Sequence, residues 1–265
     1  MINTLKKASV IFLALSGLAT ANISIDEEKM AVRASSAAYH NQNVADTKNI
    51  SDSINYFEEN GWETEFFNTY PQTSQYSSNV NNNMVKKNHF LEQYINDNQR
   101  QLNAIEQVNL ESFLVRTQVF VAYKGNQVVI SFRGSDDWSN WLLDSMAMPT
   151  EFLNTGTHVH TGFNAYLNEA IKDKKFNAWF TKNVNKNSDI IVTGHSLGAG
   201  VSVLMGAYLL ENGFSADHVK LVTFAEPAPG DFSFAQRYQA KFDNYIWNVN
   251  YADPVVWITE YVDYH

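Results

Sequence analysis

Residues 190–199 read IIVTGHSLGA, and this stretch decides the fold. Residues 190–193 form an apolar run typical of a buried strand, and the small residues that follow the turn begin a helix. Gly194 and Gly198 each stand two positions from Ser196, where a Cβ atom would collide across a sharp turn. The pattern therefore predicts a strand, a tight turn and a helix, with the Ser196 hydroxyl exposed at the turn as a nucleophile.

The helix predicted over residues 197–212 mixes small residues with apolar ones. Such a helix is buried and lies close to its neighbours. Its N-terminus points at Ser196, so the free amide of Leu197 and the positive end of the helix dipole are placed to stabilise an oxyanion. The alternative interpretation of the whole stretch is a glycine-rich connection between strand and helix.

The first 21 residues have the composition of a secretory signal peptide. Lys6 and Lys7 precede an uncharged run over residues 8–19, and Ala19-Thr20-Ala21 forms a small-x-small cleavage site. The run is too short to span a membrane. The pattern predicts cleavage after Ala21 and a secreted or periplasmic protein; the alternative is a buried N-terminal helix.

Charge and cysteine content exclude several classes of function. The 265 residues carry a net charge of −9, and loss of the two leader lysines leaves 28 acidic against 17 basic residues, a charge of −11. An acidic exported protein is a poor nucleic-acid ligand. The chain has no cysteine, which excludes disulfides, thiolate metal sites and a cysteine nucleophile.

Hydrophobic periodicity divides the chain into a signal peptide over residues 1–21, an N-terminal region over 22–110 and an α/β core over 111–265. In the N-terminal region we expect short helices, a polar loop and an amphipathic helix, at residues 26–39, 53–60, 67–83 and 85–110 respectively. In the core we expect a hairpin and further strands, at residues 117–132, 189–193, 219–224 and 245–250. Helices are predicted between them, at residues 162–172, 176–184, 197–212 and 232–242. Strands that alternate with helices predict a mixed, mostly parallel sheet flanked by helices.

An acyl-transfer site needs a second oxyanion donor and an acid in addition to its nucleophile. Ser135 ends the run Arg133-Gly134-Ser135, which closes a predicted strand, so its amide is a candidate donor; the alternative is a plain turn. Asp253 follows the last predicted strand, at the sheet edge where α/β proteins gather their sites; the alternative is a turn aspartate before Pro254. Serine followed by aspartate is the order of the α/β-hydrolases.

Together these segments resemble the fungal-type, or class 3, lipase family over about residues 110–265. The motifs that carry the resemblance are Phe132-Arg133-Gly134-Ser135, Trp141-Leu142-Leu143-Asp144, Val159-His160-Thr161-Gly162-Phe163, Gly194 to Ala199, Thr223-Phe224-Ala225-Glu226-Pro227 with Gly230-Asp231, and residues 249–258. The resemblance implies an α/β-hydrolase fold with Ser196 as nucleophile, Asp253 as triad acid, and Ser135 and Leu197 as oxyanion residues. It implies no metal and no organic cofactor.

The family also places a lid after the oxyanion strand, here residues 136–152. This segment combines Trp138, Trp141, Leu142 and Phe152 with acidic residues, as an amphipathic flap would. The alternative is a core helix behind the active strand.

The sequence assigns no histidine to the triad. His195 is next to the nucleophile, His160 resembles a structural histidine of the family, and His158 with His160 would make a metal pair without a third ligand. His265 alone follows Asp253, but it matches a non-catalytic position of the family. Three explanations stay open: the core ends before its catalytic histidine, His265 serves as the base, or catalysis is impaired.

The sequence therefore predicts an exported serine carboxylester hydrolase of lipase or phospholipase type, which contacts a lipid surface transiently and cleaves glycerolipid acyl esters through an acyl-enzyme on Ser196. A soluble-ester hydrolase such as a feruloyl esterase is the first alternative, because the same fold accommodates it. A lipid-binding module without a base is the second.

Overall fold

The hairpin predicted around Lys124-Gly125-Asn126 is part of a six-stranded sheet in the computed structural model, which describes residues 22–40, 47–69, 117–134 and 149–250. The strand order is β1-β2-β3-β6-β7-β8. The first two pairings are antiparallel and the other three are parallel. The strands are β1 (Glu63–Thr69), β2 (Thr117–Lys124), β3 (Gln127–Phe132), β6 (Asp189–His195), β7 (Val219–Phe224) and β8 (Tyr245–Asn248). The predicted mixed, mostly parallel sheet is confirmed.

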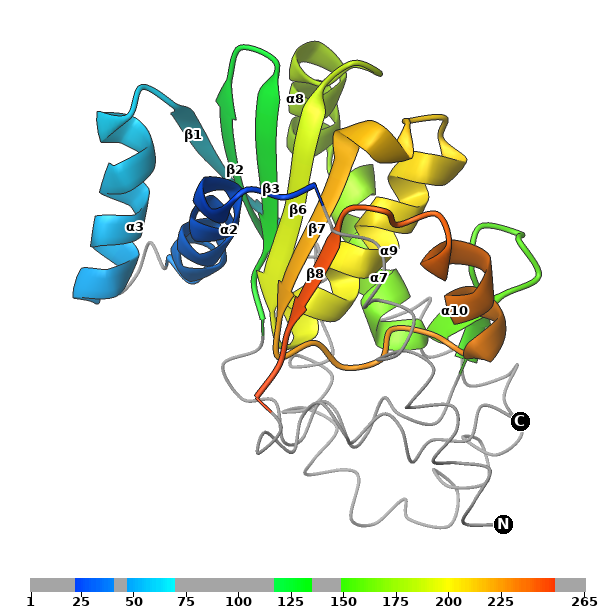
Figure 1. The fold of residues 1–265 in the computed structure, drawn as a ribbon. Helices are drawn as coiled ribbons and strands as arrows, with labels where there is room; N and C mark the ends of the chain where they lie inside the picture. The colour runs from blue at the N-terminus through cyan, green and yellow to red at the C-terminus, as the bar shows by residue number, and fades with distance from the viewer. Residues whose placement is uncertain (1–21, 41–46, 70–116, 135–148, 251–265) are drawn as a thin grey trace, which may run out of the picture.

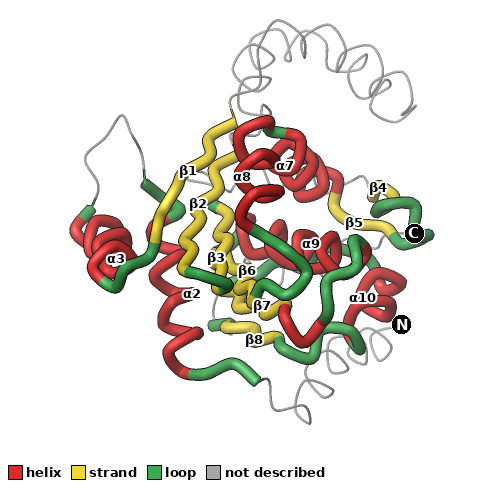
Figure 2. Tube along the Cα trace, turned by 90° about the horizontal axis from the view of Figure 1, so that it is seen from above, coloured by secondary structure: helices red, strands yellow, loops and turns green. Residues whose placement is uncertain are grey.

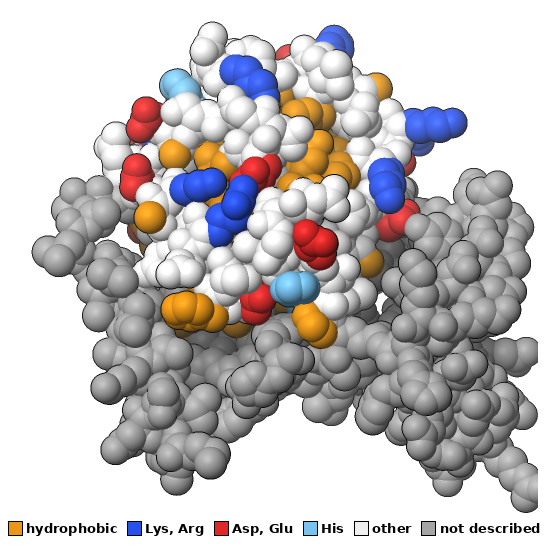
Figure 3. All heavy atoms as spheres, turned by 90° about the vertical axis from the view of Figure 1, so that its right-hand side faces the viewer, with side chains coloured by type: hydrophobic (Ala, Val, Ile, Leu, Met, Phe, Trp, Pro, Cys, Tyr) orange, Lys and Arg blue, Asp and Glu red, His pale blue; other side chains and the backbone are white. Residues whose placement is uncertain are grey.

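Helices cover both faces of this sheet, so the described residues form three layers (Figures 1 and 2). One face carries α2 (Ile25–Ala37) and α3 (Lys48–Glu59). The other face carries the helices that connect the parallel strands: α7 (Thr161–Lys172), α8 (Lys174–Asn183), α9 (Leu197–Glu211) and α10 (Phe232–Gln239). A short 3₁₀ helix, η2 (Ala216–His218), leads into β7. On the surface formed by this second layer, apolar side chains show between charged ones (Figure 3).

The strands send alternate side chains to the two helical layers. In β6, Ile190 and Val192 belong to the core beneath α7 and α9, while Ile191 belongs to the core beneath α2. Both faces of a central parallel strand are thus buried, which explains its continuous apolar run. At one position the second core is polar: Thr193 Oγ1 and Ser35 Oγ lie 2.9 Å apart, and the Thr193 hydroxyl also donates to the Val222 carbonyl.

Three elements differ from the sequence predictions. The strand β1 was not predicted; it pairs antiparallel with β2, so part of the N-terminal region is built into the main sheet. The predicted lid over residues 136–152 is wrong at its end: Pro149–Glu151 form strand β4, which pairs with β5 (His158–His160). Phe152 is fully buried there and its ring lies 5.5 Å from that of Phe234, so it belongs to the core.

Other predictions fall on residues outside the described part. These are the signal peptide, most of the polar loop, the amphipathic helix over 85–110 and the rest of the lid. The division at residue 110 stays a prediction for the same reason. Among the described helices, none has the length and apolar character needed to cross a membrane.

Candidate active site

Ser196 stands on the turn between β6 and α9, at the carboxyl edge of the sheet. Its backbone has φ 56° and ψ −127°, a combination that costs a non-glycine residue roughly 1–3 kcal/mol. The Ser196 N–H donates to the Phe224 carbonyl at 2.9 Å, and the Ser196 carbonyl accepts from the Ala199 N–H at 2.9 Å. These bonds hold the strained turn from both sides. The Ser196 side chain makes no capping bond to α9, so its hydroxyl is not engaged by its own helix.

The two glycines that flank the turn lie against backbone. A Cβ atom on Gly194 would overlap the Gly198 carbonyl, and one on Gly198 would overlap the Phe132 carbonyl. The Ser202 hydroxyl then closes the contact between α9 and β6 by donating to the Thr193 carbonyl at 2.6 Å. The steric reason for glycine that the sequence suggested is therefore confirmed by the packing.

The backbone N–H groups of Ser196 and Leu197 differ in their hydrogen bonding. The Ser196 N–H is occupied by Phe224, whereas the Leu197 N–H belongs to the first residue of α9, where no intrahelical carbonyl is available to accept from it. The positive end of the α9 dipole adds to the same location. The Leu197 N–H thus lies at the N-terminus of α9, and its role as an oxyanion donor stays a prediction.

Strand β3 brings its end to the same place. The Arg133 N–H donates to the Gln118 carbonyl and the Arg133 carbonyl accepts from the buried Tyr166 hydroxyl at 3.1 Å, so this strand end is fixed. Gly134 follows and packs against the backbone of His195. Ser135, the other predicted oxyanion residue, lies outside the described residues.

Strand β8 runs parallel to β7 and ends at the same edge of the sheet. The chain therefore leaves β8 toward Asp253 at the edge that carries Ser196. Asp253 and His265 themselves lie outside the described residues.

His195, His160 and His158 each interact with a group other than Ser196. His195 Nδ1 is hydrogen-bonded to the Tyr39 hydroxyl at 3.0 Å. His160 caps α7: its Nδ1 accepts from the Gly162 N–H at 3.1 Å, and burial lowers its pKa to about 4. His158 pairs with Asp231 at 3.3 Å. Among the described residues, no group of three potential metal ligands includes His158 and His160.

Two residues near this edge were given no role from the sequence. Glu226 follows β7; it is 5% exposed and accepts a 2.5 Å hydrogen bond from the Tyr245 hydroxyl. Burial raises its pKa to about 7. Tyr39, at the end of α2, contacts His195. Glu226 could have been noticed as an ionisable residue two positions after an apolar strand, whereas no local pattern distinguished Tyr39.

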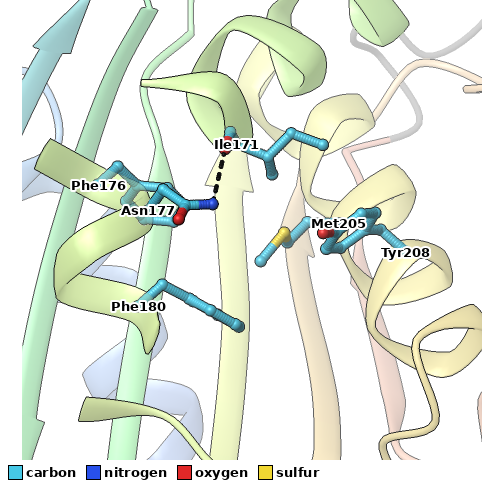
Figure 4. A pocket seen from close by; sticks show the side chains of 6 residues that line it. All are labelled: Ile171, Phe176, Asn177, Phe180, Met205 and Tyr208. Atoms are coloured by element: carbon cyan, nitrogen blue, oxygen red, sulfur yellow. Dashed lines mark hydrogen bonds between the residues drawn. The ribbon is translucent and has the colours of Figure 1, made fainter. Parts of the chain in front are cut away.

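A shallow apolar hollow between α7, α8 and α9 lies elsewhere (Figure 4). It is lined by Ile171, Phe176, Asn177, Phe180, Met205 and Tyr208. Met205 is nine residues beyond Ser196 on α9, about 13 Å along the helix axis. This hollow is therefore not the place where Ser196 would act.

The layered sheet and the strained serine turn define an α/β-hydrolase. The family model for lipase (class 3) matches residues 129–261, which is half of the chain, so the protein belongs to the class 3 lipase family. The match includes most of β3, the turn that carries Ser196, and β8.

Curated relatives agree with this assignment. A secreted mono- and diacylglycerol lipase 1 of Fusarium solani is 36% identical over 110 residues, 41% of this chain and 32% of the relative. A lipase of Rhizomucor miehei is 30% identical over 131 residues, 48% of this chain and 36% of the relative. The matches thus span about a third of each relative's length.

The fold itself is shared with solved lipases. The crystal structure of a lipase from Rhizopus microsporus var. chinensis superposes with a TM-score of 0.58 at 18% identity, covering 89% of this chain and 70% of that one. At this identity the likeness shows the fold alone.

Proposed function

We propose that the protein is a serine carboxylester hydrolase of lipase type, which cleaves acyl esters of glycerolipids. The observation that carries the proposal is the strained Ser196, held between β6 and the N-terminus of α9 with its hydroxyl unengaged by that helix. Membership of the class 3 lipase family and the lipase names of its curated relatives support the substrate class.

In the proposed reaction, the Ser196 hydroxyl attacks the ester carbonyl and loses its proton to a triad histidine. The Leu197 amide, with that of Ser135, donates to the oxyanion of the tetrahedral intermediate. The histidine then protonates the leaving alcohol, and the acyl group remains on Ser196. Water, deprotonated by the same histidine, releases the fatty acid and restores the serine. These steps use side chains and amides of the chain itself.

We assign Asp253 the role of orienting the triad histidine. The support is the strand order: β8 delivers the chain to the carboxyl edge just before Asp253. We propose that the proton carrier follows Asp253, because the α/β-hydrolases have the chain order serine, acid, histidine. Among the described histidines, His195, His160, His158 and His218 each have another partner. His265 follows Asp253 but matches a non-catalytic position of the family, so it is tested as one candidate.

We further propose that the protein is exported by its first 21 residues, with cleavage after Ala21. The secreted relatives support this location.

A substrate series tests the proposal. The purified protein is assayed on emulsified long-chain acylglycerols, on a soluble short-chain ester and on a methyl hydroxycinnamate. The variants Ser196→Ala and His265→Ala are assayed beside it. His218→Ala is the control, because the His218 ring is hydrogen-bonded to Asp189 at 2.7 Å. We expect acylglycerol turnover that is lost in Ser196→Ala and kept in His218→Ala. Loss in His265→Ala would assign the base.

Other outcomes identify the alternatives. Turnover confined to the hydroxycinnamate ester would make the protein a feruloyl-type esterase. Binding of phospholipid vesicles without turnover, kept in Ser196→Ala, would make it a lipid-binding module.

A further inference from the structure

Helix α2, in the N-terminal region, packs against the sheet on the side of β6 opposite α9. The face of α2 that is formed by small residues is buried there, with Ala31, Ala34 and Ala37 at 0% exposure. The Ser35 hydroxyl lies 2.9 Å from that of Thr193, three residues before the nucleophile. Helix α2 therefore approaches β6 closely and in a fixed position.

Tyr39, two positions after the end of α2, contacts His195, the residue before the proposed nucleophile. The Tyr39 hydroxyl is hydrogen-bonded to His195 Nδ1 at 3.0 Å. The two rings lie with centroids 6.1 Å apart. Because His195 adjoins Ser196 directly, any shift of the His195 backbone moves the strained turn.

The same tyrosine also contacts the end of β3. A Cβ atom on Gly134 would overlap the Tyr39 hydroxyl on one side and would lie 2.6 Å from the His195 carbonyl oxygen on the other. The Arg133 guanidinium carbon lies 5.6 Å from the centre of the Tyr39 ring, within cation–π range. Gly134 is thus enclosed between Tyr39 and His195.

We propose that Tyr39 is a positioning residue for ester hydrolysis: its hydroxyl holds the ends of β3 and β6 at the spacing that the oxyanion hole needs. The inference rests on the proposed function. Ester hydrolysis by this fold takes one oxyanion donor from the chain after β3 and one from the turn after β6, and such donors stabilise the oxyanion only within a narrow distance range. Tyr39 contacts both strand ends, at Gly134 and at His195.

The substitution Tyr39→Phe tests this role because it removes one oxygen and keeps the ring. Tyr56→Phe is the matched control: it also removes one phenol oxygen, and its ring also faces a guanidinium, that of Arg33 at 4.3 Å. We measure kcat and KM on a soluble short-chain ester and the thermal unfolding midpoint of the full-length parent and both variants.

We expect Tyr39→Phe to lower kcat about tenfold with KM within about twofold of the parent, and to unfold at the same temperature as Tyr56→Phe. An unchanged kcat in an active protein would overturn the inference and leave the proposed function standing. A loss of activity that is matched by a lower unfolding temperature, or confined to KM, would also overturn it, because Tyr39 would then be only structural. A parent without turnover would overturn the proposed function, and the inference with it.

Discussion

Gly198 faces the carbonyl oxygen of Phe132 so closely that a Cβ atom there would overlap it. The first turn of α9 thus lies directly on the end of β3. Across the nucleophile turn, Gly194 faces the Gly198 carbonyl in the same way. The geometry of Ser196 is therefore fixed by backbone contacts that no side chain can enter.

Gly198→Ala should be far more damaging than a glycine substitution farther along the same helix. A Cβ on Gly206 would meet the methyl groups of Leu221 at 2.9 Å, and these can move, whereas the Phe132 carbonyl cannot. We expect Gly198→Ala to cost about 3 kcal/mol in the free energy of unfolding, and Gly206→Ala less than about 1 kcal/mol because alanine favours the helix. Urea unfolding of both variants measures this; equal costs would show that the turn tolerates a side chain.

Ser196→Gly should stabilise the fold while abolishing activity. At φ 56° and ψ −127° glycine avoids the strain that a Cβ atom imposes, so we expect a gain of about 1–2 kcal/mol in the free energy of unfolding. Ser196→Ala keeps the Cβ atom and is the control for loss of the hydroxyl alone. If Ser196→Ala proved as stable as Ser196→Gly, the backbone strain at this turn would be disproved.

Glu226→Gln should gain stability relative to the parent as the pH rises. Burial raises the pKa of Glu226 from 4.5 to about 7, so between these values the folded protein keeps a proton that the unfolded chain releases, and stability falls with rising pH. The full effect is roughly 3 kcal/mol above pH 7. Gln still accepts from the Tyr245 hydroxyl but does not titrate. We measure unfolding at about pH 5 and pH 8, with the exposed Glu59→Gln controlling for the lost charge. A constant difference between Glu226→Gln and parent would contradict the assignment.

His160→Asn should have the opposite pH dependence. Burial lowers the pKa of His160 from 6.5 to about 4. As the pH falls between these values, the unfolded chain binds a proton at His160 that the folded protein does not bind, so the free energy of unfolding decreases. Asn retains an acceptor for the Gly162 N–H at the start of α7. We expect the parent, compared with the variant, to lose roughly 3 kcal/mol between about pH 6.5 and pH 4. Parallel stability curves for the two proteins would show that His160 does not titrate as stated.

The sequence predicted the elements that are marked by residues close together in the chain. The turn at Ser196 followed from two glycines and a flanking apolar run, and the hairpin of β2 and β3 from Gly125, which has a positive φ of 60°. Strand β1 was missed because its residues Glu63 to Thr69 are largely polar; pairing with β2, rather than hydrophobic alternation, makes it a strand. Strands β4 and β5 have three residues each, too few for a period to show.

The contacts around the site depend on residues far apart in the chain. Tyr39 and His195 are separated by 156 positions, and no local pattern predicts that the end of α2 reaches the nucleophile turn. The buried state of Glu226 likewise depends on Tyr245 from the next strand. Sequence reasoning could locate the turn that carries Ser196, but not the side chains that surround it.

The most direct test of the central claim is covalent labelling of the purified protein with a serine-reactive alkyl phosphonate, followed by peptide mass spectrometry. We predict one label per chain, on Ser196, and no label in Ser196→Ala, which retains the fold. A label on another serine, or an unlabelled parent protein, would contradict the assignment of Ser196 as the nucleophile.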